Sequence, residues 1–352
     1  MGWSDTPMTH NRIVFFRTEA DSRIGLGHLQ RCLSLAVALR RYRMESVFLI
    51  NPDPVAHEWV AREGFRIEAI HRVSLGGERD VQAALAAAAV KAPSLMVLDS
   101  YRLGDGYRLQ LKNAGLSLVA VTDGNRQPRF CRLVVNASPH GDAALVARHI
   151  NGTQVLTGFA YAVLRPEFSV IPTRTIRREV REILITVGGT DLRGLIPRLL
   201  AMLDSLAGNF CIRVAVGPFV KDPKRVRECA AVCRRKVEFL FGLPCLRDAM
   251  LQADLAISGG GQTLYELANT GTPTVAIQVA KNQTPTLRAF TVEGAIETAG
   301  KAEERSMIRR AKALVERLLA NEADRQRLSR NGRRLVDGRG AERVARKIAS
   351  LA

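Results

Sequence analysis

The chain has 352 residues and a formal net charge of +18, with 47% hydrophobic, 5% aromatic and 24% charged residues. This length is enough for two domains with a core each, and the lack of a long apolar run argues against a membrane-spanning helix. The first residues lack the apolar stretch of a secretory signal, so we expect a cytoplasmic protein.

The positive charge comes mainly from arginines that are spread along the whole chain. They do not interleave with aromatic residues, so no stacking platform for nucleic acid is visible and a nucleic-acid partner is disfavoured. The densest basic runs, residues 174–181 and 327–340, indicate a linker and an exposed helix face. An anionic ligand or a peripheral contact with membrane lipid headgroups fits the charge equally well.

Metal-ligand spacing is missing from the sequence. Cys229 and Cys233 are four residues apart, but no second pair or nearby histidine completes a site. The histidines besides His28 share no metal spacing either: His10, His57, His71, His140 and His149. We therefore expect no metal and no cofactor, and six buried free thiols in a reducing compartment.

Short apolar runs alternate with helical stretches in both halves of the chain. In the first half, strands are predicted at 13–16, 46–50, 65–69, 95–98, 118–121 and 132–135, and helices at 28–43, 54–62, 78–90 and 105–113. The pattern restarts with strands at 182–187, 211–216, 237–239, 255–257 and 274–277, and helices at 195–206, 223–235 and 262–270. This alternation predicts an α/β fold of two doubly wound, Rossmann-like domains with parallel sheets.

The predicted domain boundaries follow from composition. The first domain is placed at 1–165, a proline-containing charged linker at 166–181, the second domain at 182–300 and a charged helical tail at 301–352. Ligands bind at the carboxyl ends of the strands in open α/β sheets. We therefore expect the two domains to face each other across a cleft that the loops after their strands line.

A glycine-rich loop in the second half predicts a nucleotide site. It follows strand 255–257 and opens helix 262–270 with Ser258, Gly259, Gly260, Gly261, Gln262 and Thr263. Glycines let a phosphate approach the backbone, and the helix start offers free N–H groups and the positive end of the dipole. Glu266 lies about one turn into the helix, where its carboxylate could accept both hydroxyls of a ribose. A tight turn followed by a surface glutamate explains the loop equally well.

Gly188 and Gly189 repeat this arrangement after strand 183–187. Two glycine-ended strands in one domain favour a nucleotide diphosphate as ligand. Neither loop matches the Walker pattern or GxGxxG, so a P-loop ATPase or a dinucleotide enzyme is disfavoured.

His28 follows the glycines Gly25 and Gly27 at the mouth of the first predicted helix. A helix N-terminus disfavours imidazolium, so His28 should stay neutral and able to accept a proton, as a general base must. The alternative is a histidine that only caps the helix. In the first domain, Asp99, Tyr101 and Asp123 follow strands and are candidates for contacts to a sugar, or else turn-capping residues.

Several segments together resemble the nucleotide-sugar hydrolases of pseudaminic acid synthesis, which are related to a GT-B glycosyltransferase of peptidoglycan synthesis. The resemblance covers roughly Arg12 to Ala289 and lies in RTEADSRIGLGHLQRCLSLAVALR, LMVLDSYRL, VAVTDGNRQPRFC, LTGFAYAVLRPEF, ILITVGGTD and ADLAISGGGQTLYELANTGTPTVAIQVAKNQ. Members remove UDP from UDP-2,4-diacetamido-2,4,6-trideoxy-β-L-altropyranose. The chain departs from them at Arg132, where relatives usually have an acidic residue, and in the segment 125–127.

The resemblance implies a GT-B-like fold and a role for several residues. His28 would activate water, Glu266 would hold the ribose, and Asn282 and Gln283 would lie near the sugar. Gly25, Gly27 and Arg31 belong to the histidine segment and are expected to line the sugar site. Inversion at the anomeric carbon without a metal is implied as well.

These observations predict a hydrolase that releases UDP from a UDP-linked acetamido-deoxy sugar by attack of water at the anomeric carbon. Two alternatives stay open. One is a GT-B glycosyltransferase that uses a UDP-sugar donor in polysaccharide or glycan synthesis. The other is a non-catalytic protein that binds a nucleotide sugar or nucleic acid.

Overall fold

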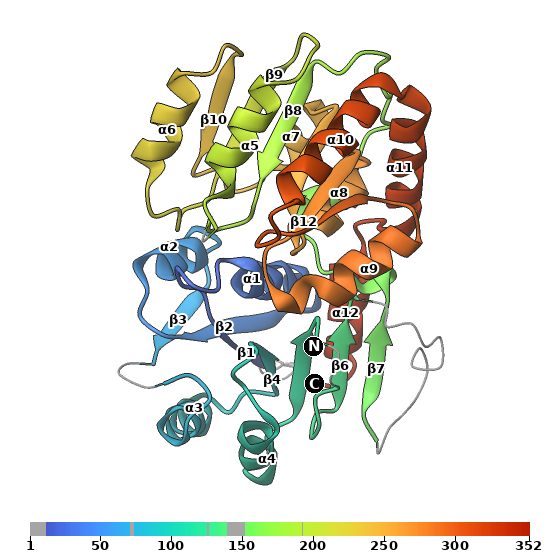
Figure 1. Ribbon diagram of the computed structural model, residues 1–352. Coiled ribbons are helices and arrows are strands. Elements are labelled where there is room, and N and C mark those ends of the chain that lie inside the picture. Colours follow the sequence, from blue (N-terminus) through green and yellow to red (C-terminus); the bar gives the residue numbers. More distant parts are fainter. Residues whose placement is uncertain (1–11, 71–73, 125–126, 139–151, 192) are drawn as a thin grey trace, which may run out of the picture.

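The computed structural model describes residues 12–70, 74–124, 127–138, 152–191 and 193–352. Two parallel sheets stand one above the other, each flanked by helices (Figure 1). The first has seven strands in the order β3-β2-β1-β4-β5-β6-β7, and the second has six in the order β10-β9-β8-β11-β12-β13. Every paired strand in both sheets runs parallel to its neighbour. The predicted pair of doubly wound domains is confirmed.

The described elements of the first half are β1 (Arg12–Thr18), α1 (Gly27–Leu39), η1 (Arg40–Tyr42), β2 (Met44–Ile50), α2 (Pro54–Arg62), β3 (Arg66–Ala69), α3 (Glu78–Lys91), β4 (Leu95–Asp99), α4 (Asp105–Asn113), β5 (Leu118–Thr122), β6 (Leu133–Asn136) and β7 (Gln154–Thr157). The connection from β7 to β8 holds η3 (Phe159–Tyr161) and η4 (Pro166–Phe168). From here on, linker means the whole of this connection, residues 158–181, which includes the predicted linker 166–181.

The described elements of the second half are β8 (Glu182–Thr186), α5 (Leu195–Asp204), β9 (Cys211–Val216), α6 (Pro223–Ala231), β10 (Val237–Phe241), α7 (Arg247–Gln252), β11 (Leu255–Gly259), α8 (Thr263–Thr270), β12 (Thr274–Gln278), η5 (Lys281–Gln283), α9 (Thr284–Val292), β13 (Glu297–Lys301), α10 (Met307–Ala320), α11 (Glu322–Leu335) and α12 (Gly340–Ala349).

Each sheet is buried on both faces, which explains why its central strands read as continuous apolar runs. In β1, Val14 and Phe16 pack into the core beneath α1, whereas Phe15 points into the core on the opposite face of the sheet. All three side chains are fully buried.

The C-terminal helices serve both domains. Helix α10 packs against α5 and β13 of the second domain, and α11 packs against α8. Helix α12 instead crosses to the first domain, where Val344 and Ile348 join the core beneath α1. The predicted boundaries at 165, 181 and 300 stay a prediction, but the segment 301–352 is divided between the two cores.

Some predicted boundaries differ from the structure for local reasons. Helix α1 ends at Leu39, because a 3-10 turn follows and Arg43 adopts a left-handed conformation with φ of 54°. Helix α6 ends before Arg234, whose N–H donates to the Asp204 carboxylate at 2.9 Å. The strands β7 and β13 are short and half-buried, and they lack the apolar run by which the other strands were predicted.

The linker and the crossing into α12 lie against each other. Gly338 has φ of +76°, and a Cβ there would overlap the carbonyl oxygen of Phe168. A Cβ at Gly340 would likewise overlap the carbonyl oxygen of Ala162. Both connections between the domains therefore share one tightly packed strip.

Gly338→Ala should reduce the free energy of unfolding by about 2 kcal/mol or more, because the added methyl group meets backbone in a conformation that L-residues avoid. Gly106→Ala is the matched control, since Gly106 is exposed and a Cβ there meets no atom within 4 Å. It should change stability by less than about 1 kcal/mol. Denaturant titration measures both, and equal stabilities would show that the two connections are not packed together.

Candidate functional site

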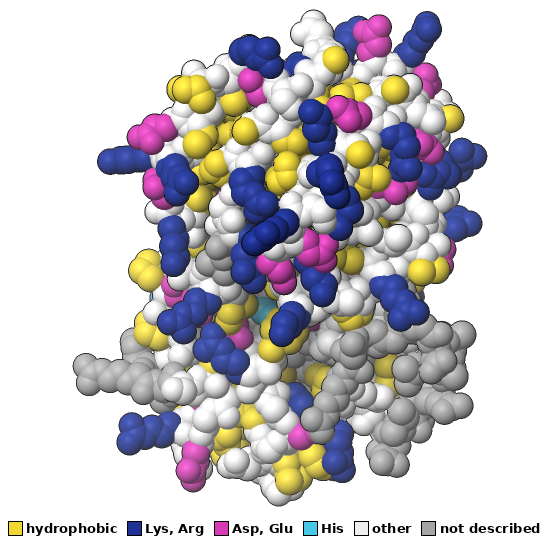
Figure 2. Space-filling view, viewed as in Figure 1, with side chains coloured by type: hydrophobic (Ala, Val, Ile, Leu, Met, Phe, Trp, Pro, Cys, Tyr) yellow, Lys and Arg dark blue, Asp and Glu magenta, His cyan; other side chains and the backbone are white. Residues whose placement is uncertain are grey.

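A cavity of about 570 Å³ lies between the two domains, lined by loops at the carboxyl ends of strands from both sheets. A group of Lys and Arg side chains lies near the boundary between the two domains, at the centre of the view in Figure 2. All of the predicted site residues line this cavity except Ser258 and Asp99, which are both fully buried. The loops chosen from the sequence therefore lie around one common cavity.

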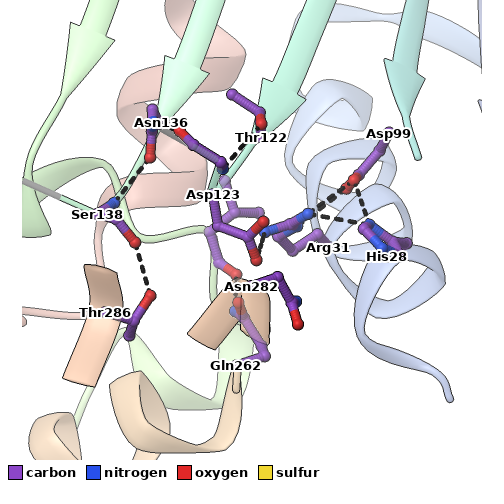
Figure 3. A network of polar contacts seen from close by, with 12 residues as sticks. His28, Arg31, Asp99, Thr122, Asp123, Asn136, Ser138, Gln262, Asn282 and Thr286 are labelled. Carbon is purple, nitrogen blue, oxygen red and sulfur yellow. Dashed lines mark hydrogen bonds and ion pairs between the residues drawn. The ribbon is translucent and has the colours of Figure 1, made fainter. Parts of the chain in front are cut away.

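His28 lies in the first turn of α1 and contacts a buried carboxylate. Its Nδ1 is 2.6 Å from Oδ1 of Asp99, the last residue of β4 (Figure 3). Burial opposes ionisation of Asp99, but Arg31 and His28 outweigh burial and lower the pKa of this carboxyl group. Because Asp99 is ionised, Nδ1 carries the proton that joins the two groups. This leaves Nε2 of His28 as the proton acceptor of the ring.

Arg31, one turn further along α1, fixes Asp99 from the other side. Its Nε donates to Oδ2 at 2.9 Å and its Nη2 donates to Oδ1 at 2.7 Å, a bidentate arrangement. Nη2 also lies 3.1 Å from Nδ1 of His28, but its proton points to the carboxylate, because Nδ1 is itself a donor. The imidazole, the carboxylate and the guanidinium thus form one rigid cluster.

A second chain of polar contacts crosses the cleft. Nη1 of Arg31 lies 3.3 Å from Oδ2 of Asp123, and the Tyr101 hydroxyl donates to the other oxygen of that carboxylate. Asn282 of the second domain donates from Nδ2 to the Tyr101 oxygen at 2.8 Å. The Tyr101 ring packs edge-on against His28, with ring centroids 4.6 Å apart. Four of the predicted sugar-site residues, Arg31, Tyr101, Asp123 and Asn282, therefore meet around the histidine.

The start of α8 offers N–H groups to the cavity. No side chain caps this helix, and the N–H groups of Leu264 and Tyr265 already donate to the carbonyl oxygens of Gly261 and Gln262, each at 3.0 Å. Among the described residues, the N–H groups of Gly261, Gln262 and Thr263, just ahead of them, have no hydrogen-bond partner. The N-cap residue Gln262 instead donates from Nε2 to the carbonyl oxygen of Val163 at 2.6 Å. One N–H of the loop is already occupied, because Oε1 of Gln283 accepts from Gly260 at 3.2 Å. Gln283 thus braces the glycine loop.

The Gly188–Gly189 loop has a different environment. A Cβ at Gly189 would lie 3.3 Å from the Leu26 nitrogen and 3.4 Å from the Gly25 Cα, so these glycines let the two domains touch. The start of the following helix, α5, is also occupied. Asp191 accepts there from the N–H groups of Leu195 at 2.7 Å and of Ile196 at 2.9 Å. An anion therefore finds unoccupied N–H groups in the loop that leads into α8, whereas Asp191 occupies those at the start of α5.

Glu266 is half-buried one turn into α8, on the wall of the cavity. Burial raises the pKa of Glu266 to about 7, with Arg165 acting against this rise and Glu167 adding to it. A ligand that donates hydrogen bonds to this carboxylate stabilises its ionised form.

Sequence reasoning missed several lining residues. One face of α2 lines the cavity with Val55, Glu58, Trp59 and Arg62, and Arg165 of the linker region lies on the same wall. The loop after β10 also contributes; its start, 241–243, was among the loops expected to line the cleft, whereas residues 244–246 were missed. The i, i+3, i+4, i+7 spacing on α2 is an amphipathic pattern that could have pointed to a buried face, although not to a ligand.

Three expectations need correction, stay predictions or fall outside the described residues. Asp99 is a buried partner of His28 that does not line the cavity between the domains, so its predicted contact with a sugar stays a prediction. Only Cys32 and Cys131 are buried, whereas the other four free cysteines are partly exposed. His10, His71, His140 and His149, and the unusual residues 125–126, lie outside the described residues.

Other sequence features lie away from the cavity. Arg132, which departs from the resembling family, donates to the carbonyl oxygen of Leu351 at 3.1 Å. Among the residues described, no group of three or more His, Cys, Asp or Glu side chains could hold a metal ion. Within the same residues, no helix is long and apolar enough to cross a membrane.

No family model matches the chain, but individual proteins do. The Bacillus subtilis spore coat polysaccharide biosynthesis protein SpsG is 27% identical over 56% of this chain and 59% of its own length. The UDP-2,4-diacetamido-2,4,6-trideoxy-beta-L-altropyranose hydrolase of Campylobacter jejuni is 24% identical over 52% of this chain and 62% of its own length. The chain is a distant homologue of both, and it spans about three fifths of the length of each.

Solved structures match the fold over nearly the whole chain. MurG of Acinetobacter baumannii has a TM-score of 0.70 at 15% identity, covering 97% of this chain and 99% of that one. The structure of S. aureus MnaA with UDP has a TM-score of 0.66 at 12% identity, covering 96% of both chains. The expected GT-B-like fold is confirmed.

Arg31→Met should lower the free energy of unfolding by about 3–5 kcal/mol, because it leaves the buried Asp99 carboxylate without its main cation. Arg66→Met is the control, since Arg66 pairs with Glu45 at 3.0 Å with 58% of its side chain exposed. That change should cost less than about 1 kcal/mol. A similar cost for both in chemical denaturation would mean that the Asp99 charge does not depend on Arg31.

Proposed function

We propose that the protein is a hydrolase that releases UDP from a UDP-linked acetamido-deoxy sugar by attack of water at the anomeric carbon. The observation that carries this proposal is that His28, paired with the buried Asp99, lines the same cavity as the unoccupied N–H groups ahead of α8. A base and an anion site on opposite domains suit a substrate whose sugar meets one domain and whose diphosphate meets the other. The distant homology to a UDP-sugar hydrolase supports the substrate class.

His28 acts as the base in this proposal. Its Nε2 accepts a proton from water as the oxygen attacks the anomeric carbon on the face opposite the diphosphate. The ionised Asp99 holds Nδ1 and stabilises the imidazolium that forms. Attack from that face breaks the bond to the diphosphate oxygen and inverts the anomeric centre.

The departing UDP is stabilised by the second domain. The N–H groups of Gly261, Gln262 and Thr263 and the dipole of α8 offset the charge that develops on the diphosphate, so no residue needs to protonate it. Glu266 accepts hydrogen bonds from the ribose hydroxyls. Tyr101, Asp123 and Asn282 surround the sugar next to His28.

A glycosyltransferase of the same fold is the second candidate. A separate cavity of about 530 Å³ shares His28 and Tyr101 with the first and extends along β4, β5 and the start of α4. That space could hold an acceptor whose hydroxyl His28 deprotonates. An assay of UDP release from a panel of UDP-sugars separates the two: release in water alone supports the hydrolase, and release only with an added acceptor supports the transferase.

Glu266→Ala should weaken UDP binding roughly tenfold to a hundredfold, the cost of one or more hydrogen bonds to a charged group. The fold should stay intact. Wild-type affinity should also be higher at pH 8 than at pH 6, because the carboxylate with a pKa of about 7 ionises over that interval. The terminal phosphate of UDP also titrates in this interval. Glu266→Gln should therefore keep only the part of the affinity difference between pH 6 and pH 8 that comes from this phosphate.

Glu58→Ala is the control for Glu266, because Glu58 lines the same cavity from α2 and pairs with Arg62. Calorimetry should find its UDP affinity close to that of the wild type. If Glu266→Ala binds UDP as tightly as this control does, Glu266 has no part in the nucleotide site.

His28→Asn should leave UDP affinity nearly unchanged, because the nucleotide contacts belong to the second domain. Turnover should fall by about 10²–10⁴, the range for loss of a general base. His57→Asn is the control, since His57 lies on α2 outside the residues that line the cavity. If the His28→Asn variant turns over at the wild-type rate, His28 is not the base and only occupies the start of α1.

A further inference from the structure

The linker between the domains runs along the start of α8. Gln262 ties it there through the carbonyl oxygen of Val163 at 2.6 Å. Arg165 follows two residues later on the linker, and Glu266 follows four residues later on the helix, about 6 Å further along its axis. Because the linker and α8 run side by side here, the Arg165 guanidinium and the Glu266 carboxylate both line the cavity.

Arg165 is a buried arginine with unused hydrogen-bonding capacity. It is 9% exposed, and its Nη2 donates to Oε1 of Glu63, next to α2, at 2.8 Å. Its guanidinium carbon lies 5.9 Å from the centre of the Trp59 ring. Nε lies 3.5 Å from a Glu167 oxygen but is buried without a hydrogen-bond partner. Because Arg165 lines the cavity and its guanidinium is not fully hydrogen-bonded, it can donate to a ligand oxygen there.

We propose that Arg165 is a binding residue of the nucleotide site, which lies near Glu266 on the cavity wall and donates from its guanidinium to the bound nucleoside. This inference rests on the proposed binding of a uridine nucleotide. It adds the linker and the first domain to nucleotide recognition, because Arg165 is held by Glu63 and Trp59 of that domain.

Two charged groups act on the Glu266 carboxylate, and one titratable thiol lies near it. Arg165 favours its ionisation, and Glu167 disfavours it. The Cys245 thiol, which also lines the cavity, has a pKa that burial raises to about 11, so it is uncharged near neutral pH. Arg165 is therefore the cation that opposes burial at this carboxylate. Its removal should shift the ionisation of Glu266 to higher pH.

The test is UDP affinity by calorimetry from pH 5.5 to 8.5 for the wild type, Arg165→Gln, Arg165→Lys and Glu266→Gln. Arg165→Gln should weaken binding roughly tenfold and move the midpoint of the Glu266-dependent pH change upward by about half a unit or more. Arg165→Lys keeps the charge but loses the fork of donors, so it should weaken binding while keeping the midpoint. In the Glu266→Gln background, Arg165→Gln should cost much less affinity, because the two residues act together.

Arg343→Gln is the matched control: Arg343 also contacts the linker, at the carbonyl oxygen of Ala160, but does not line the cavity. It should keep both affinity and midpoint. The inference is overturned if both Arg165 variants bind UDP with the affinity and the pH midpoint of the wild type. If Arg165→Gln does not fold, wild-type UDP affinity in Arg165→Lys is enough to overturn it. No binding of UDP by the wild type would overturn the proposed function and this inference with it.

Discussion

The charge of Asp99, buried between His28 and Arg31, is the interaction on which the site depends. A carboxylate without exposed surface is stable only when it is paired and fully hydrogen-bonded, and Arg31 and His28 supply these contacts. The same contacts decide the tautomer of the imidazole. They also connect α1 to the end of β4, so the base is oriented by two central elements of the first domain. Rigid elements hold such geometry better than loops do.

The backbones of the two domains come into close contact at glycine residues, which have no side chains to separate them. Gly189 lies against Gly25, and Gly217 packs so closely on Gly189 that a Cβ there would overlap its carbonyl oxygen. On the other side of the cleft, Ser138 of the first domain bonds to Thr286 at 2.7 Å and to Tyr265 at 3.0 Å (Figure 3). The cavity lies between these contacts, so small residues and hydroxyl groups set its width.

The alternation of apolar runs and helical stretches was enough to predict two parallel sheets and the loops that face the cleft. Residue type at strand ends also led to His28, Asp99 and Glu266. The sequence did not reveal where these side chains point. Asp99 pairs with His28, Gln283 accepts from the Gly260 N–H, and Asp191 accepts from the N–H groups at the start of α5. These outcomes depend on distances between segments far apart in the chain. Arg165 was overlooked for the same reason, because its partners come from both domains.

Hydrolysis of a UDP-sugar that the enzyme accepts, carried out in water enriched in oxygen-18, tests the central claim most directly. Attack of a His28-activated water at the anomeric carbon predicts one labelled oxygen in the released sugar and none in UDP, as mass spectrometry of the two products can measure. Label in the terminal phosphate of UDP would contradict this account, because it would place the attack at phosphorus.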